Sequence, residues 1–256
     1  MAKKLYEESK IAGIAEKIRE KTGGTDEYTT AEMPGGVDAV YEAGRQAEHK
    51  EFWDECLREN ATDFSFRFAG MCWTDLTFNP TDDIIPPYGS ANNMFCNSRI
   101  TDLEAILKRN NVIFDVSRCS RYDYAFGYCK ETVCIPEIVM GSNTTTISHM
   151  FADCLALHTI RKIYFPAKTL VTTNAFYGCQ ALVNLTIGGT IAATGIDLHW
   201  STLLSRESIE SVINALSDTT TGMAITFSQA AVNAAFTDAE WSALESTKTN
   251  WTIVLA

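Results

Sequence analysis

A repeat of 25 residues constrains the fold of this chain more than any other feature of its sequence. A phenylalanine followed three residues later by a cysteine occurs at 126–129, 151–154 and 176–179, so both residue types recur at one interval. An earlier, degenerate copy has Phe95 followed by Ser98 in place of the cysteine. A unit this short cannot bury its own apolar side chains, so neighbouring units must stack. The sequence therefore predicts a solenoid with a continuous core.

Apolar residues after each cysteine predict one short strand per repeat. Each apolar series ends with the spacing of two that is typical of strands, as at Ile163 and Phe165. We expect the strands to end at Pro136 and Pro166, because proline cannot donate a hydrogen bond to a strand ladder.

The repeat also predicts where the cysteines lie. Stacking places Cys129, Cys154 and Cys179 at equivalent buried positions, beside an internal ladder of phenylalanines. The eight cysteines of the chain could form four disulfides, but the chain lacks a signal peptide and the paired spacing of metal-finger cysteines. We therefore expect reduced thiols that pack as small buried side chains.

The repeat resembles a known class. Residues 154–179, CLALHTIRKIYFPAKTLVTTNAFYGC, are similar to the bacterial surface-antigen class of leucine-rich repeat, called BspA-like. The resemblance covers about residues 94–200 and implies a leucine-rich-repeat solenoid that presents a binding face. The chain departs from the pattern at two places. About three additional residues precede Pro166, and Gly188–Gly189 stands where the class has proline.

A second resemblance concerns the N-terminal segment. Residues 11–23 and 28–34 look like the opening of tail-associated proteins of phages and prophages in gut Firmicutes. This resemblance implies a virion or prophage structural protein whose repeat domain faces a partner.

The expected fold class is α+β, with N-terminal helices, short parallel strands in the solenoid and a C-terminal α/β cap. The expected order is a helical segment at 1–60, an irregular aromatic-rich connector at 61–93, the solenoid at 94–204 and a capping module at 205–256. Helical spacing of apolar residues places N-terminal helices at about 11–18 and 36–60. They could form a homo-oligomer, attach the chain to a larger assembly or cap the first repeat.

The C-terminal module shows its own signals. Apolar residues at helical spacing predict a helix at 205–216, and Thr237 with Glu240 forms the capping box that opens another. Residues 225–227 and 251–255 have the apolar character of strands. A different terminal module is expected, because an exposed solenoid end invites pairing with another chain.

Charge and hydropathy restrict the partners. The formal net charge is −11, from 21 basic and 32 acidic residues, which argues against nucleic acid. No apolar run is long enough to span a membrane, so membrane insertion is not expected. The polar start of the chain does not resemble a signal peptide, so we expect a virion or cytoplasmic location, with the cell surface as the alternative.

Signatures of catalysis are weak. The nucleotide, dinucleotide, serine-hydrolase and zincin motifs do not occur. Cys154 lies in the column expected to be buried, where a thiol with a nearby His149 would be inert. Asp63 and Asp82–Asp83 fit solvated turns better than a calcium loop or a hydrolase. We therefore expect no catalytic residue, no cofactor, no metal and no enzyme.

Recognition by an exposed surface remains. The residues expected to face outward on the strands and the preceding unit form the candidate binding surface: Tyr122, Tyr124, Tyr128, His158, Arg161, Lys162 and Tyr164. Tyrosine and arginine are enriched at binding hot spots. The expected ligand is a protein or a cell-surface glycan. The leading hypothesis is a non-enzymatic phage or prophage tail component. A bacterial adhesin of the same repeat class is the alternative, and a glycan or peptidoglycan hydrolase is the least favoured.

Overall fold

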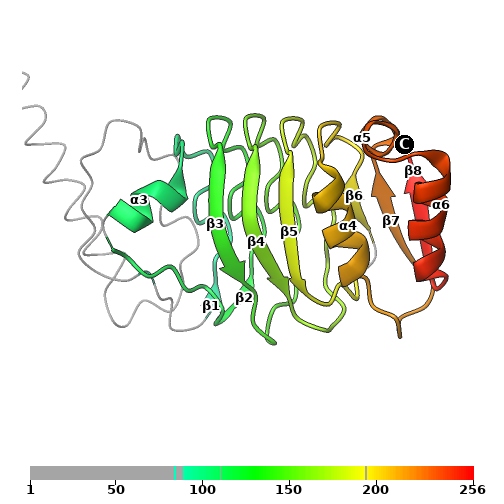
Figure 1. Cartoon of the computed structure of the whole chain (residues 1–256). Coiled ribbons are helices and arrows are strands. Elements are labelled where there is room, and N and C mark those ends of the chain that lie inside the picture. Colours follow the sequence, from blue (N-terminus) through cyan, green and yellow to red (C-terminus); the bar gives the residue numbers. More distant parts are fainter. Residues whose placement is uncertain (1–83, 85–88, 110, 194) are drawn as a thin grey trace, which may run out of the picture. The chain divides into compact units, whose positions relative to one another are not determined.

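A computed structural model describes residues 84, 89–109, 111–193 and 195–256 (Figure 1). The chain divides into two units, residues 1–56 and 57–256, and every described residue belongs to the second. The helices expected at 11–18 and 36–60 lie outside the described residues, as does most of the expected connector at 61–93.

The described part is mixed α+β, with short parallel strands in three small sheets. The first sheet pairs β1 (Gly89–Ser90) with β2 (Cys119–Arg121). The second has the order β3 (Cys134–Val139), β4 (Thr159–Phe165) and β5 (Asn184–Gly189), and the third the order β6 (Ile196–Leu198), β7 (Met223–Phe227) and β8 (Trp251–Leu255). All of these pairs are parallel. The parallel strands expected at the end of each apolar series are therefore confirmed.

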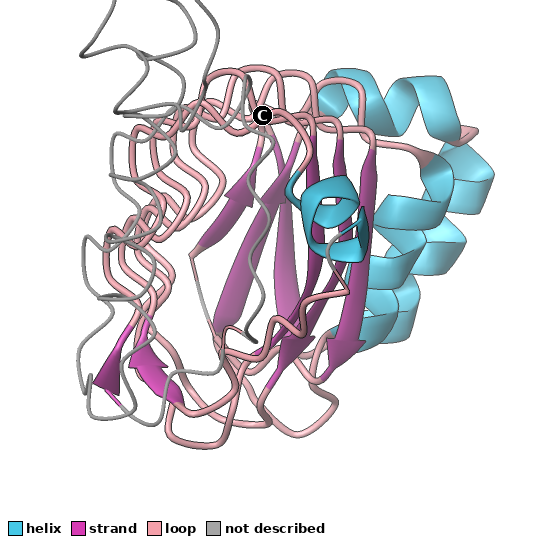
Figure 2. Cartoon of the chain, turned by 90° about the vertical axis from the view of Figure 1, so that its left-hand side faces the viewer, coloured by secondary structure: helices cyan, strands magenta, loops and turns pink. Residues whose placement is uncertain are grey.

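Successive repeats are joined by a second ladder, in the loops that hold the Phe-x-x-Cys pattern. We call residues 91–98, 122–129, 147–154 and 172–179 the turn row. In it, backbone N–H groups of one loop donate to carbonyls of the next, as from Tyr124 to Ser148 (3.0 Å), Phe126 to Met150 (2.8 Å) and Tyr128 to Ala152 (2.7 Å). Figure 2 shows these loops stacked one behind another along one side of the strands. Each loop thus satisfies its backbone on its neighbour, as a strand does.

The phenylalanines of the turn row form the predicted internal ladder. Ring centroids are 5.1 Å apart between Phe95 and Phe126, 5.6 Å between Phe126 and Phe151 and 5.5 Å between Phe151 and Phe176. All four rings are buried and nearly parallel to their neighbours. Their shared period places them in one column of the core.

The cysteines form a second column that is tied to the first. The thiols of Cys129, Cys154 and Cys179 are buried and donate to the carbonyls of Phe95 (2.9 Å), Phe126 (3.0 Å) and Phe151 (3.2 Å) in the preceding loops. Cys96, Cys119, Cys129, Cys134, Cys154 and Cys179 are free cysteines, whereas Cys56 and Cys72 lie outside the described residues. The cysteine of the repeat is therefore a small buried donor for a backbone oxygen.

Substitution of Cys154 tests this hydrogen bond. We expect Cys154→Ala to lower the free energy of unfolding by about 1–3 kcal/mol, because the buried carbonyl of Phe126 loses its donor. Cys154→Ser keeps a donor, as Ser98 does in the first loop, and is expected to lose less. Equilibrium unfolding in urea measures both values, and equal losses for the two variants would show that the thiol acts by volume alone.

The strand boundary expected at Pro136 is wrong. β3 continues through this residue to Val139, with Ile135 paired with Ile160 and Glu137 with Lys162. Proline is tolerated because β3 is the edge strand of its sheet, so a missing N–H on the outer side breaks no ladder bond. The boundary expected at Pro166 is confirmed, since β4 ends at Phe165.

Helices flank the three-stranded sheet at both edges (Figure 1). α3 (Leu103–Arg109), which the sequence patterns did not predict, contacts β3. α4 (Arg206–Ala215) is the predicted helix and lies against β5. Its Ser208 and Ser211 hydroxyls accept hydrogen bonds from the backbone N–H groups of Leu185 (2.8 Å) and Ile187 (2.9 Å). These serines saturate the edge of β5 and thereby block pairing with another chain.

The C-terminal module is a continuation with longer units. Helices α4, α5 (Gln229–Ala235) and α6 (Asp238–Glu245) and the short 3-10 helix η1 (Ser246–Lys248) connect the parallel strands β6, β7 and β8. Thr237 and Glu240 form the predicted capping box at the start of α6. The strands expected at 225–227 and 251–255 are confirmed within β7 and β8.

Candidate functional site

The candidate residues from the sequence fall on two parts of the repeat. Tyr124 and Tyr128 lie in the turn row, whereas Arg161, Lys162 and Tyr164 lie on β4. His158 immediately precedes β4 and is exposed. The sequence grouped these residues on one face, because it did not separate the turn of the repeat from its strand.

Tyr122 is wrongly included in the candidate surface. Its side chain is 1% exposed, and its hydroxyl donates to the carbonyl of Val116. Tyr122 lies 25 residues before Ile147, a buried residue of the next loop, so it occupies a core column of the repeat. Burial raises the pKa of the Tyr122 phenol far above its usual range, which keeps it neutral.

The β4 group forms a flat surface of mixed charge. The ammonium of Lys162 lies 5.0 Å from the ring centroid of Tyr164, which is 42% exposed. Arg161 pairs with Glu104 of α3, so its guanidinium is already engaged. Burial alone would raise the pKa of Glu104, but hydrogen bonds from Lys108, Arg161 and Cys134 outweigh it and lower the pKa to about 2. This carboxylate therefore holds α3 to β4 as an anion.

The turn row contains a more unusual feature, which is a left-handed backbone at two positions of every loop. The first position is occupied by Asn93, Tyr124, His149 and Asn174, and the second by Asn97, Tyr128, Asp153 and Gly178, with φ between 54° and 72°. Asparagine, aspartate, histidine and glycine are the residues that favour this conformation, whereas a bulky residue there is an outlier. Tyr124 and Tyr128 are therefore the two exceptions, at a cost on the order of 1–2 kcal/mol each.

The side chains at these exceptions gather into one cluster, which we call the ring strip: Tyr124, Tyr128 and His149. The Tyr124 ring is nearly parallel to His149, with centroids 4.5 Å apart and 9° between planes, and to Tyr128, at 6.0 Å and 10°. Tyr128 is 40% exposed. Burial, followed by the neighbouring Tyr128, raises the pKa of Tyr124, so its phenol stays neutral. Stacking offsets part of the backbone cost, at about 0.5–1.5 kcal/mol per pair.

A shallow groove of about 620 Å³ lies beside the ring strip. Its lining residues are Asn92, Arg121, Asp123, Tyr124, Thr145, Thr146, Ser148, His149 and Val171. Asp123 accepts hydrogen bonds from Arg121 Nη2 (2.8 Å), from Arg121 Nε (3.1 Å) and from the Thr146 hydroxyl. Asn92 Oδ1 in turn accepts from the backbone N–H of Asp123 (2.8 Å). The polar side chains of the groove are therefore held in fixed positions next to the rings.

A second aromatic cluster lies further along the chain and was missed by the sequence patterns. The Trp200 ring packs edge-on against Tyr177, at 5.3 Å between centroids, and lies 4.7 Å from His199. His199 Nδ1 is 2.7 Å from Asp197 Oδ1. Trp200 escaped attention because the loop that holds it is out of step with the 25-residue period, since Ser201, which bonds to the carbonyl of Cys179, follows it by 22 residues.

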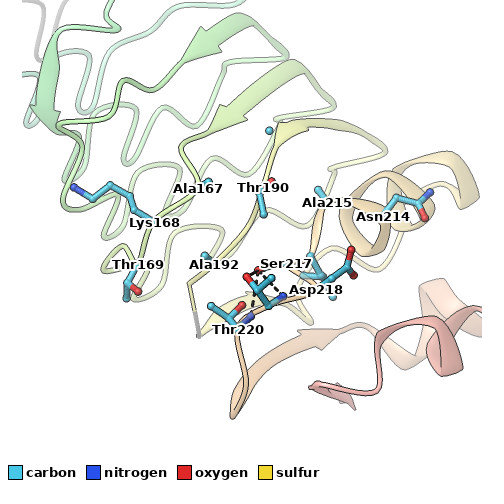
Figure 3. Close-up of a pocket in the computed structure, with 13 residues that line it drawn as sticks. Ala167, Lys168, Thr169, Thr190, Ala192, Asn214, Ala215, Ser217, Asp218 and Thr220 are labelled. Atoms are coloured by element: carbon cyan, nitrogen blue, oxygen red, sulfur yellow. Dashed lines mark hydrogen bonds between the residues drawn. The ribbon is translucent and has the colours of Figure 1, made fainter.

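A different pocket, of about 520 Å³, lies where the loops after β4 and β5 meet residues 214–220 (Figure 3). Its hydroxyl-bearing side chains mainly shape their own turn. Ser217 Oγ accepts from the backbone N–H groups of Thr219 (3.2 Å) and Thr220 (3.3 Å), as the dashed lines in Figure 3 show. The buried Lys248 donates to the carbonyl of Leu216 (2.7 Å) and to Asp218 (2.6 Å). These contacts fix the turn and bring no aromatic platform to the pocket.

The described residues offer little for catalysis. Burial raises the pKa of Cys154 well above its usual range, so the thiol stays protonated and unreactive. Among residues 84, 89–109, 111–193 and 195–256, no group of three or more His, Cys, Asp or Glu side chains is arranged to hold a metal ion. In the same part of the chain, no helix is both long and apolar enough to cross a membrane. Asp63 and Asp82–Asp83 lie outside the described residues.

Comparisons with known proteins add no relative. No protein-family model, no curated protein and no solved structure matches this chain. The ring strip and its groove are therefore assigned as the candidate site from their geometry.

Proposed function

We propose that this chain is a non-enzymatic binding protein, a BspA-like leucine-rich-repeat solenoid that recognises its ligand through the ring strip. The observation that carries the proposal is the placement of Tyr124 and Tyr128 at left-handed backbone positions. Other loops fill these positions with asparagine, aspartate or glycine, which fit without strain. Strain that is retained at an exposed position points to a functional role for the side chain.

The solenoid assignment is supported by the periodic stacking of the repeats. β3 pairs with β4 and β4 with β5 in parallel, and the turn row repeats this pairing on another side of the chain. A solenoid of this kind builds extended surfaces from equivalent positions of successive units. The ring strip spans two units and the groove three, so the proposed surface depends on the stacking of units and not on one loop.

We place the protein in the tail of a phage or prophage, where it would contact the surface of a bacterial cell. This placement depends on the resemblance of residues 11–23 and 28–34 to tail-associated proteins of gut Firmicutes. A tail protein needs a recognition surface and an attachment segment. The turn row would supply the first, and the N-terminal segment the second.

Binding of the full chain to intact cells tests the proposal. The fluorescently labelled protein would be titrated onto a panel of gut Firmicutes strains and measured by flow cytometry. The ring-strip variant carries Tyr124→Gly, Tyr128→Gly and His149→Asn, which leave residues suited to a left-handed backbone at all three positions. We expect the wild-type protein to bind at least one strain, and the variant to lose at least tenfold in apparent affinity.

The first loop offers a matched control. Asn93→Gly with Asn97→Gly changes the equivalent backbone positions without removing a ring, and is expected to bind like the wild type. Circular dichroism would verify that all variants keep the wild-type fold. The proposal fails if the ring-strip variant binds as tightly as the wild type, or if no strain in the panel is bound. Loss of binding through Arg161→Ala and Tyr164→Ala alone would transfer the function to the β4 surface.

A further inference from the structure

The groove beside the ring strip has the chemistry of a sugar site, and we propose that it binds a neutral sugar unit of a cell-surface polysaccharide. This inference rests on the proposed function and names its ligand class. The groove volume of about 620 Å³ lies within the range of small-molecule sites, roughly 300–1,000 Å³. Its lining combines aromatic rings with closely placed donors and acceptors, whereas Val171 is its one aliphatic lining residue apart from threonine methyl groups.

The ion pair of Arg121 with Asp123 provides the central polar contact. A guanidinium has five N–H donors, and two of them are used in the pair. A carboxylate accepts about four hydrogen bonds, and Asp123 receives three, from Arg121 and Thr146. The pair therefore presents remaining donors beside remaining acceptor capacity. Adjacent hydroxyl groups of a sugar, each of which donates and accepts, complement this arrangement.

The pair is also held in place before any ligand binds. Asp123 is fixed from two sides, by the Thr146 hydroxyl at its carboxylate and by Asn92 at its backbone N–H. Its side chain is 15% exposed, whereas that of Arg121 is 56% exposed and reaches solvent. Fixed polar groups lose little conformational entropy on binding, which favours a ligand that forms several weak hydrogen bonds.

The rings supply the apolar part of the site. Tyr124 and His149 form a rigid wall of the groove, because their planes differ by 9° and His149 Nε2 contacts Asn174 Nδ2 at 3.0 Å. A sugar has C–H groups on the faces of its ring, which pack against aromatic carbon. The wall and the ion pair would thus contact the apolar and the hydroxyl-bearing parts of one sugar unit.

Charge favours a neutral sugar over an acidic one. The ion pair itself carries no net charge, and the chain as a whole has a net charge of −11, which repels anionic polymers. A protein ligand is disfavoured for another reason. Protein hot spots need apolar pockets that become fully desolvated, whereas this groove is shallow and lined mainly by polar side chains.

Selective destruction of cell-surface components tests the inference on the strains that bind the wild-type protein. Periodate cleaves the vicinal diols of sugars, and proteinase K removes surface protein. We expect periodate treatment to abolish binding and proteinase K to leave it unchanged. A microarray of defined neutral and acidic oligosaccharides then provides isolated ligands, and we expect signals from neutral members only.

Arg121→Ala assigns the binding to this groove. We expect at least a tenfold loss of apparent affinity for the strongest oligosaccharide on the array. Arg99→Ala is the matched control, because Arg99 also pairs with an acidic side chain, Glu131 (3.0 Å), but does not line the groove. It should leave affinity unchanged.

The outcomes separate this inference from the proposed function. Binding that survives periodate but not proteinase K would overturn the sugar site and leave the recognition function intact. Signals from acidic oligosaccharides alone, or equal affinities of Arg121→Ala and the wild type, would also overturn it. An absence of cell binding by the wild type would instead contradict the proposed function itself.

Discussion

Phe151→Ala is expected to lower the free energy of unfolding by about 3–5 kcal/mol, the largest effect of any single substitution considered for this chain. Phe151 is 0% exposed and has a phenylalanine ring on both sides, at 5.6 Å and 5.5 Å. Removal of the central ring leaves a cavity that the two neighbours cannot fill, because hydrogen bonds between successive loops hold them in place. Equilibrium unfolding of the full chain in urea, followed by circular dichroism, measures the loss.

Val171→Ala is the control for this experiment. Val171 lies in the adjacent repeat and is 55% exposed, so its truncation should change stability by no more than about 0.5 kcal/mol. A loss below about 1 kcal/mol for Phe151→Ala would contradict the continuous phenylalanine ladder.

Gly189→Ala is expected to destabilise the protein by about 2–4 kcal/mol, because it combines backbone strain with a steric clash. Gly189 ends β5 with φ of 72°, where a side chain is unfavourable. A Cβ atom there would lie 2.1 Å from the carbonyl oxygen of Phe165, which belongs to the backbone of β4 and cannot rotate away. Thermal or urea unfolding compares the variant with the wild type.

The neighbouring Gly188 offers a matched comparison. A Cβ atom at Gly188 would meet the Tyr164 ring and Lys162 Cε at 2.5–2.7 Å, and these side chains lie on the surface of β4 and can move. We therefore expect Gly188→Ala to cost less than about 1 kcal/mol. Equal losses for Gly188→Ala and Gly189→Ala would show that the close approach at Phe165 does not limit this position. The pair also explains why this repeat has two glycines where the resembled class has proline.

The core of the described part could be predicted from the sequence because its period is simple. A recurrence of 25 residues fixes which side chains align, so the phenylalanine column and the three aligned cysteines followed directly. The same rule would have placed Tyr122 in the core, since Ile147 follows it at that interval. Tyr122 was misassigned because a tyrosine in a row of tyrosines was interpreted by its type and not by its column.

The candidate site could be predicted only in part. Tyr124 and Tyr128 were selected as exposed aromatic residues, but the sequence does not reveal that their backbone is left-handed. The available signal was the column itself, because Asn93, Asn174 and Gly178 are residues that favour this conformation. The groove partners Arg121 and Asp123 could not be found from spacing, since the groove forms only when three successive loops stack.

The strand positions of the candidate surface illustrate a different limit. Alternation identified Arg161 and Tyr164 as outward-facing, and they are exposed. The partner of Arg161 is Glu104, a residue 57 positions away on a helix that no sequence pattern predicted. Long-range ion pairs of this kind depend on tertiary structure, so the availability of Arg161 for a ligand could not be judged beforehand.

Radical footprinting of the cell-bound protein tests the central claim, recognition through the ring strip, most directly. Hydroxyl radicals oxidise exposed tyrosine and histidine side chains, and mass spectrometry quantifies the oxidation of each peptide in the free and the bound protein. The account predicts protection of Tyr124, Tyr128 and His149 on binding, with unchanged oxidation of Tyr164 on β4. Protection of Tyr164 with no change in the ring strip would contradict it.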